Sequence, residues 1–155
     1  MPSGTTTIEI RASAEDIFDL IHNYSRRLEW DPFLREARLL EGAKKADIGV
    51  TSRCVAHRGV GGLAMDTVYI SFNRPTVASV KMTRGPYLFR TFAATIRQES
   101  LNTQATLVTY NYNFQTKPGW LAFLIEPVVQ RIFHREIRQR LVALKSFLEH
   151  KLHRH

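Results

Sequence analysis

Residues 120–155 read WLAFLIEPVVQRIFHREIRQRLVALKSFLEHKLHRH and contain no glycine. Apolar side chains recur in this stretch at steps of three and four residues, which is the spacing of one face of an α-helix. They are Leu121, Ile125, Val129, Phe133, Ile137, Leu141, Leu144 and Leu148. At about 1.5 Å per residue, a helix from Trp120 to His150 would be roughly 45 Å long. Pro127 lies inside the pattern and predicts a kink or a restart of the helix there.

The residues before this helix predict a sheet on which its apolar face can pack. Short apolar runs alternate there with glycine, proline and asparagine, a pattern typical of strands and turns. We expect strands at residues 5–11, 33–40, 48–57, 63–72, 76–83, 88–97 and 106–114. Their short connections predict antiparallel pairing. Ser13 is a candidate N-cap for a helix after the first strand, and a second helical turn is expected at residues 25–28.

Alternation within three of these strands predicts which side chains face the interior, because successive side chains of a strand point to opposite faces. In the last strand the expected interior residues are Val108, Tyr110, Tyr112 and Phe114. In the strand at 63–72 they are Asp66, Val68, Ile70 and Phe72. In the strand at 88–97 they are Arg90, Phe92, Ala94 and Ile96, although Phe89 does not fit this alternation.

Length and composition indicate one ordinary globular domain. The chain has 155 residues, of which 44% are apolar, and we expect a single domain over residues 1–155. Neither an 18-residue apolar run nor a secretion signal is recognisable. Cys54 is the single cysteine, so an internal disulfide is excluded and a cytoplasmic location is the expectation.

The charge is strongly positive and unevenly spread. The net charge is +8, and much of the excess lies from Arg131 to the end of the chain. Such a field can attract an anionic membrane, nucleic acid or an acidic partner, although a solvated basic helix face is the simpler interpretation. We expect at most a transient contact with anionic membrane. Nucleic acid is not expected as a partner because no recognised nucleic-acid motif is present. Nothing in the sequence specifies an oligomeric state.

No known catalytic or metal-binding pattern is present. The glycine-rich stretch RGVGGLA, residues 58–64, joins two predicted strands and predicts a hairpin rather than a phosphate loop. His134 has no second histidine four residues later, as a zinc helix would require. A solvated tail is the preferred interpretation of His150, His153 and His155. We therefore predict no metal and no cofactor, and assign no catalytic residue. Cys54 is expected to be a buried small residue.

Four local sequences resemble one known family. They are SAEDIFDLI at 13–21, EWDPF at 29–33, TLVTYNYNF at 106–114 and ALKSFLE at 143–149. They resemble the opening and the close of the polyketide cyclase/dehydrase-like branch of the START-like, or SRPBCC, superfamily. The resemblance implies an α+β helix-grip fold. In that fold a curved antiparallel sheet of seven strands wraps around a long C-terminal helix, and two short helices follow the first strand.

The resemblance also implies a large, mainly apolar cavity between the sheet and the long helix. Carried onto this sequence, its lining residues would be Phe72, Phe92, Tyr110, Tyr112, Val129, Phe133 and Ile137. Trp30 matches the tryptophan of the family's Trp-Asp-Pro motif and would lie at the lip of the cavity. A structural role for Trp30, as the anchor of a turn, is the alternative.

Two polar groups of residues are further candidates for ligand contact. Glu136 and Arg140 stand four residues apart on the apolar side of the helix, a spacing that favours an ion pair. Such a pair could bind a ligand carboxylate or phenolate, or it could reach past the sheet edge into water. Arg90, Tyr110 and Tyr112 could orient a carbonyl or hydroxyl group in an otherwise apolar pocket. Alternatively, the tyrosines are core residues and Arg90 lies at the rim.

Three functions fit these observations. The leading hypothesis is the binding or transfer of a hydrophobic small molecule, such as a lipid, an isoprenoid quinone or a polyketide, without catalysis. An enzymatic alternative is a polyketide aromatase/cyclase in which Arg90, Tyr110 or Tyr112 polarises a carbonyl while the pocket positions the chain. The third is a membrane-associated quinone-binding module that the basic helix draws to anionic lipid.

Overall fold

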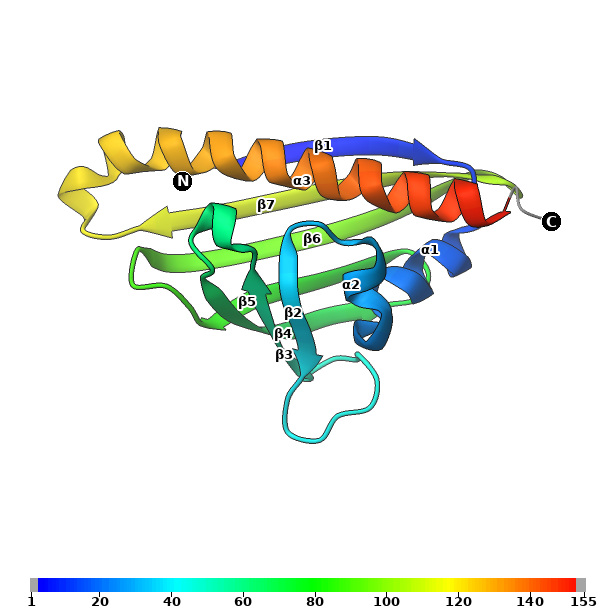
Figure 1. The fold of residues 1–155 in the computed structure, drawn as a ribbon, viewed down its shortest axis with the longest axis horizontal. Helices are drawn as coiled ribbons and strands as arrows, with labels where there is room; N and C mark the ends of the chain where they lie inside the picture. The colour runs from blue at the N-terminus through cyan, green and yellow to red at the C-terminus, as the bar shows by residue number, and fades with distance from the viewer. Residues whose placement is uncertain (1–2, 153–155) are drawn as a thin grey trace.

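A curved sheet with one long helix along it makes up most of the molecule (Figure 1). The computed structural model describes residues 3–152. Within this range the seven strands pair in the order β1-β7-β6-β5-β4-β3-β2, and each neighbouring pair is antiparallel. The strands are β1 Ser3–Ile10, β2 Leu34–Leu39, β3 Thr51–Ala56, β4 Ala64–Asn73, β5 Val77–Arg84, β6 Phe89–Asn102 and β7 Ala105–Thr116. The predicted helix-grip fold of the α+β class is confirmed.

The short helices after β1 occur where the sequence predicts them. Their bounds are α1 Ala14–Ile21, the 3-10 turn η1 Tyr24–Arg26 and α2 Arg27–Trp30. Ser13 is the N-cap of α1, since its hydroxyl accepts a hydrogen bond from the backbone N–H of Asp16 at 3.1 Å. Two further 3-10 turns, η2 Arg58–Val60 and η3 Gly119–Leu121, precede β4 and the long helix. The stretch RGVGGLA therefore joins two strands, as predicted.

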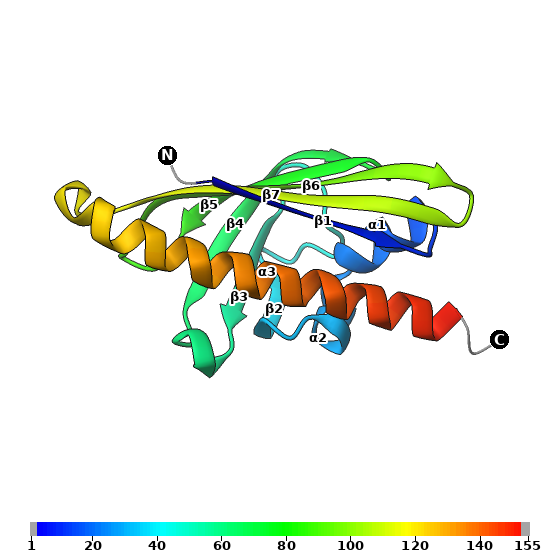
Figure 2. The same ribbon diagram turned by 90° about the horizontal axis from the view of Figure 1, so that it is seen from above.

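The long helix α3, Ala122–Leu152, is one continuous element that does not restart at Pro127. Figure 2 shows it running along the sheet, and it packs on β1 and β7. Apolar residues of its second half are fully buried in the main core, among them Ile137, Leu141 and Leu144. In the first half, Val129 and Phe133 are only partly buried. The second half therefore anchors the helix, and the first half covers a cavity on the concave side of the sheet.

Irregular pairing corrects two of the predicted strand faces. In β4 the register shifts between Tyr69 and Ser71, so that Tyr69 is 2% exposed whereas Ile70 is 51% exposed. In β6 it shifts between Phe89 and Thr91, which buries Phe89 and leaves Arg90 exposed. An extra residue in one strand reverses the face of every side chain beyond it. The alternation that predicted Ile70 and Arg90 as interior residues was wrong for this reason.

Other interior predictions are confirmed in β7 and wrong for Asp66 in β4. Val108, Tyr112 and Phe114 of β7 are buried in the main core, which confirms the prediction for that strand. Asp66 of β4 was predicted to face the interior. It instead forms a bidentate ion pair with Arg53 of β3 at 2.8 and 2.9 Å, on the side of the sheet opposite the cavity-lining Met65 and Thr67.

Candidate functional site

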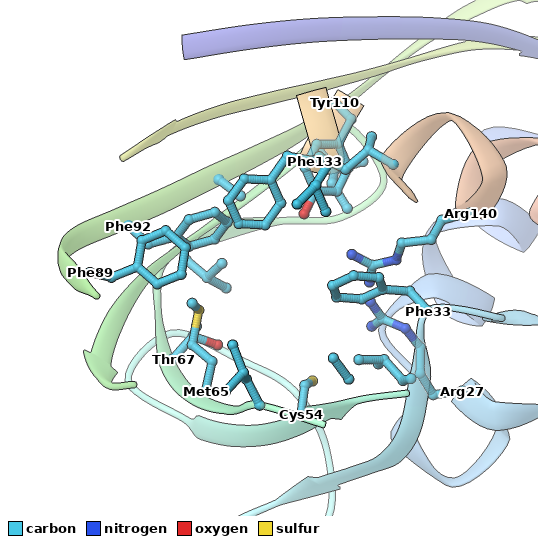
Figure 3. Close-up of a pocket in the computed structure, with 18 of the residues that line it drawn as sticks. Arg27, Phe33, Cys54, Met65, Thr67, Phe89, Phe92, Tyr110, Phe133 and Arg140 are labelled. Carbon is cyan, nitrogen blue, oxygen red and sulfur yellow. The ribbon is translucent and has the colours of Figure 1, made fainter. Parts of the chain in front are cut away.

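A cavity of about 470 Å³ lies between the concave face of the sheet and α3 (Figure 3). Strands β3 to β7 contribute most of its wall, and α1, α2 and α3 close it. Its lining is predominantly aliphatic and aromatic. The apolar lining residues include Phe33, Leu34, Leu63, Met65, Val80, Leu88, Phe89, Phe92, Ala94, Ile96, Val129, Ile132, Phe133 and Ile137. Such a concave, mostly apolar space with a few polar groups is typical of a small-molecule site.

Aromatic rings form one side of the cavity. The ring of Phe133, on α3, lies with its centroid 5.7 Å from that of Phe89 and 5.4 Å from that of Phe92. Tyr112 and Phe114 pack behind it at 5.5 and 5.6 Å. These distances are those of favourable aromatic pairs. The cluster connects α3 to β6 and β7 and gives this part of the cavity a rigid apolar wall.

Two arginines and one aspartate form the opposite side. Figure 3 shows the guanidinium groups of Arg27 and Arg140 pointing toward the cavity beside Phe33. Between them lies Asp31, which accepts hydrogen bonds from Arg27 Nε at 2.9 Å and from Arg140 Nη2 at 2.9 Å. Its other oxygen accepts from the backbone N–H of Phe33 at 3.0 Å. Arg27 also donates to the carbonyl of Ile21 at 3.0 Å.

This arginine–aspartate cluster carries a net charge of +1 inside the protein. Burial opposes ionisation of the Asp31 carboxyl, but the charges of Arg140 and Arg27 outweigh burial and hold its pKa below the ordinary value. Burial alone would lower the pKa of each arginine, yet Asp31 keeps both values raised. All three groups are therefore ionised at neutral pH.

Neutral polar side chains line the cavity between α1 and the sheet. Tyr24 Oη donates to Ser52 Oγ at 3.2 Å and lies 3.0 Å from Tyr69 Oη. Tyr69 Oη in turn lies 2.8 Å from His22 Nδ1. Burial raises the pKa of both tyrosine hydroxyls, and burial, followed by the charge of Arg27, lowers the pKa of His22 to about 3. This wall is uncharged at neutral pH.

Cys54 lines the cavity on the same side of the molecule as the arginines. Burial raises the pKa of its thiol above the ordinary value, although Arg27 and Arg140 act in the opposite direction. The thiol is therefore protonated at neutral pH and is a poor nucleophile. Its side chain is only partly buried, so the prediction of a small buried residue is confirmed only in part.

Six of the predicted ligand-binding residues line this cavity, and five do not. The lining residues are Phe92, Tyr110, Val129, Phe133, Ile137 and Arg140. Among the others, Phe72 packs against Phe18 with ring centroids 5.0 Å apart, in a second, smaller core. Arg90 is exposed on the far side of β6. The predicted cluster of Arg90 with two tyrosines is therefore not assembled.

Trp30 and Tyr112 are core residues. Trp30 is buried, and the guanidinium carbon of Arg27 lies 5.1 Å from its ring centroid. Trp30 thus packs against the guanidinium group of Arg27 and does not line the cavity. Its role is structural, which was the alternative to ligand contact. Tyr112 is buried in the main core, and its hydroxyl donates to the carbonyl of Gln130 at 3.4 Å.

Glu136 and Arg140 do not pair with each other. Arg140 binds Asp31, which is 109 positions away in the sequence. Glu136 is buried with its carboxylate 3.5 Å from His57 Nε2 and 3.3 Å from Arg135 Nη2. The predicted i,i+4 ion pair was wrong because tertiary contacts supply each side chain with a different partner.

The cluster's other members, Arg27 and Asp31, were not predicted as site residues. One signal for them was available, because they stand four residues apart and follow one another on a short helical segment. Within the Trp-Asp-Pro motif the tryptophan was the predicted site residue, whereas the aspartate, Asp31, is the residue that binds both arginines. Within residues 3–152 no group of three or more His, Cys, Asp or Glu side chains is placed to hold a metal ion. His153 and His155 of the predicted solvated tail lie outside the described residues.

Comparison with known proteins agrees with this geometry. A family model described as polyketide cyclase / dehydrase and lipid transport matches residues 1–149. No curated protein sequence matches the chain. A START superfamily protein from Mycobacterium smegmatis superimposes with a TM-score of 0.77 at 16% identity, over 96% of this chain and 97% of that one.

Two further solved structures have the same fold. The Zhui aromatase/cyclase from Streptomyces sp. R1128 superimposes with a TM-score of 0.78 at 14% identity, over 97% of this chain and 95% of that one. A point mutant of Thalictrum flavum norcoclaurine synthase, in complex with a transition state analogue, does so with 0.74 at 18% identity, over 97% and 96%. From the match over residues 1–149, the chain belongs to the polyketide cyclase / dehydrase and lipid transport family.

Proposed function

We propose that this protein binds a hydrophobic small molecule, such as a lipid, an isoprenoid quinone or a polyketide, in the cavity under α3 and carries it. The observation that supports this most directly is the cavity of about 470 Å³ with its nearly continuous apolar and aromatic lining. Transfer of apolar ligand surface from water into such a space is favourable by roughly 25 cal/mol per Å². The family description, which includes lipid transport, is consistent with this proposal.

A cyclase activity receives less support from the geometry. Of the three residues proposed to polarise a carbonyl, Tyr110 alone lines the cavity, where the guanidinium carbon of Arg140 lies 5.9 Å from its ring centroid. The aromatase/cyclase and the synthase among the similar structures share the fold with this chain. The same fold supports many unrelated functions, so this likeness does not carry an activity over.

Filling the cavity tests the proposed binding function. Figure 3 shows Met65 projecting into the cavity from β4. We expect Met65→Trp to weaken the binding of the neutral apolar fluorophore N-phenylnaphthylamine by about tenfold or more, because the indole occupies the space of the ligand. Fluorescence titration measures the dissociation constant. Val142→Trp is the matched control, since Val142 is exposed on α3 and does not line the cavity. Equal affinities for wild type and both variants would contradict binding in this cavity.

An exposed apolar surface at the start of α3 favours delivery of the ligand at a membrane. Trp120, Leu124, Val128 and Ile132 recur at steps of four residues, and all are exposed, as is Phe123 beside them. None of the helices in the described range 3–152 is long and apolar enough to cross a bilayer. An apolar stripe of this kind can still insert into the headgroup region of a membrane.

The charges next to this stripe favour an anionic membrane. At about 100° per residue, Arg131, Arg135 and Arg138 lie on the same helix face as the exposed stripe. Arg131 lies within the stripe, and the other two follow Ile132 by about one and about two turns. Basic residues near an anionic surface contribute about 1 kcal/mol each to its binding. Ile132 and Arg135 also line the cavity, so the stripe adjoins the cavity wall. A ligand could pass between the two at this point without crossing bulk water.

We expect the double variant Trp120→Ser, Phe123→Ser to bind anionic vesicles about tenfold more weakly than wild type, because both apolar anchors are lost. Co-sedimentation with phosphatidylglycerol vesicles at low salt measures the partition coefficient. Ile70→Ser is the control, since Ile70 is also an exposed apolar side chain but lies on β4, away from the stripe. Absence of wild-type binding at low salt, or an equal loss in the control, would contradict the membrane contact.

A further inference from the structure

We propose that the ligand of this cavity is amphipathic and anionic, with one carboxylate-sized oxygen head seated on Arg27 and Arg140 and its apolar body lying toward Phe89 and Phe92. This inference rests on the proposed binding function and specifies the chemical class of the ligand. Figure 3 shows the arginines and these two phenylalanines on opposite sides of the cavity, so a ligand lying across it can meet both.

The first observation is an imbalance of charge around the cavity. Its charged lining residues are three arginines, Arg27, Arg135 and Arg140, and none of the described lining residues is an aspartate or glutamate. Asp31, between Arg27 and Arg140, does not line the cavity, and its single charge offsets only one of the two arginines that it binds. The carboxylate of Glu136 is turned to His57 and Arg135. His22, Tyr24 and Tyr69 also line the cavity, but they are uncharged at neutral pH and do not offset the excess of positive charge.

The second observation is unused hydrogen-bonding capacity on both buried guanidinium groups. Arg27 donates through Nε and Nη1, and Arg140 donates through Nε and Nη2. Among the described residues, Nη2 of Arg27 and Nη1 of Arg140 have no hydrogen-bond partner. Both side chains are mostly buried, with exposed fractions of 8% and 13%. Neither nitrogen is among the fully enclosed polar atoms that lack a partner, so both stay accessible, and an oxygen anion in the cavity that these arginines line can accept hydrogen bonds from them.

The third observation is that the guanidinium groups are held in place. The ring centroid of Phe33 lies 5.0 Å from the guanidinium carbon of Arg140, and that of Trp30 lies 5.1 Å from the guanidinium carbon of Arg27. Asp31 fixes one edge of each group. Since little side-chain freedom is left to lose, a head group can bind two donors at a small entropic cost. A carboxylate, phenolate or enolate oxygen matches this arrangement.

Three ligands with the same tail distinguish a site for an anionic head group from hydrophobic binding alone. Dodecanoate, dodecanol and dodecylammonium share an apolar chain and carry an anionic, a neutral and a cationic head group, and isothermal titration near neutral pH gives their affinities. We expect dodecanoate to bind about tenfold or more tightly than dodecanol, and dodecylammonium to bind most weakly, because hydrogen bonds between two charged groups are stronger than those that a neutral hydroxyl makes. Equal affinities for the three would overturn the anionic head but leave hydrophobic binding intact. Binding of none of them would overturn both.

A charge-removing variant locates the head group. In Arg140→Gln we expect the preference for dodecanoate over dodecanol to fall about tenfold, because dodecanoate loses one of its two charged donors while dodecanol is still bound. Dodecanol thus reports, in the same variant, that the cavity is intact. Arg138→Gln is the matched control, because Arg138 is exposed on the same helix and should leave the preference as in wild type. An unchanged preference in Arg140→Gln, or an equal fall in Arg138→Gln, would overturn the placement of the head on the cluster.

Discussion

Replacing Asp31 with asparagine should lower the free energy of unfolding by about 3–5 kcal/mol, because it leaves two buried arginines without their counter-charge. The Asp31 side chain has no exposed surface and receives hydrogen bonds from Arg27, Arg140 and the backbone of Phe33. Asparagine keeps the shape of the side chain but removes its charge and places an amide N–H₂ group among donors. The loss therefore combines the missing charge with the loss of an acceptor oxygen among three donors.

The measurement is urea denaturation of wild type and variant near neutral pH, with the midpoint and the slope compared. Asp19→Asn is the control. Asp19 forms a bidentate pair with Arg74 at 2.7 and 2.9 Å, but its side chain is 56% exposed. Water and salt screen such a pair, so the same substitution there should have a much smaller effect. Similar losses in both variants would show that burial of the cluster does not amplify its contribution.

Lowering the pH from about 7.5 to about 5 should remove about 2 kcal/mol of stability through His22 alone. Burial and then Arg27 lower the pKa of this imidazole from 6.5 to about 3 in the folded protein. Between those two values the unfolded chain binds a proton that the folded chain does not bind. Stability therefore falls as the pH falls through about 6.5, and continues to fall until about pH 3.

The hydrogen bonds of His22 explain why its protonated form is excluded. With Tyr24 donating to Ser52, the consistent chain has Tyr69 donating to Tyr24 and His22 Nδ1 donating to Tyr69. Nε2 of His22 is then the bare nitrogen, and it is buried without a partner among the described residues. Protonation would place a new donor and a charge at this position, near the cationic cluster.

The pH dependence can be measured as the free energy of unfolding at several pH values above 5, where the aspartates with lowered pKa are still ionised. His22→Gln should flatten the curve in this interval, whatever its stability at neutral pH. His134→Gln is the control substitution, because His134 is exposed on α3. If the His22 variant kept the wild-type slope, another group would be responsible for the titration.

Most of the architecture could be predicted from local patterns. The seven strands, the Ser13 cap and the long C-terminal helix each depend on residues that are near one another in the sequence. The errors within these elements came from β-bulges. The bulges that expose Ile70 and Arg90 depend on pairing with neighbouring strands, which alternation along a single strand does not contain.

The site could be predicted only in part, and its apolar side was predicted best. The aromatic residues Phe92 and Phe133 were found because the faces of a strand and a helix are periodic. The charged side was misassigned, since Arg140 was matched with Glu136 on the same helix. The observed partner, Asp31, comes from a turn at the other end of the chain.

By itself, the sequence determined the strands and helices, including a long helix whose apolar face must pack on a sheet. The reason is that the periodicity of apolar residues, the helix caps and the turn residues each depend on a few neighbouring positions. Only the tertiary structure decided which charges meet. Long arginine side chains reach several partners at similar cost, and the choice among them depends on which carboxylate the fold buries beside them. For this protein that choice placed Arg27, Asp31 and Arg140 together beside an apolar cavity.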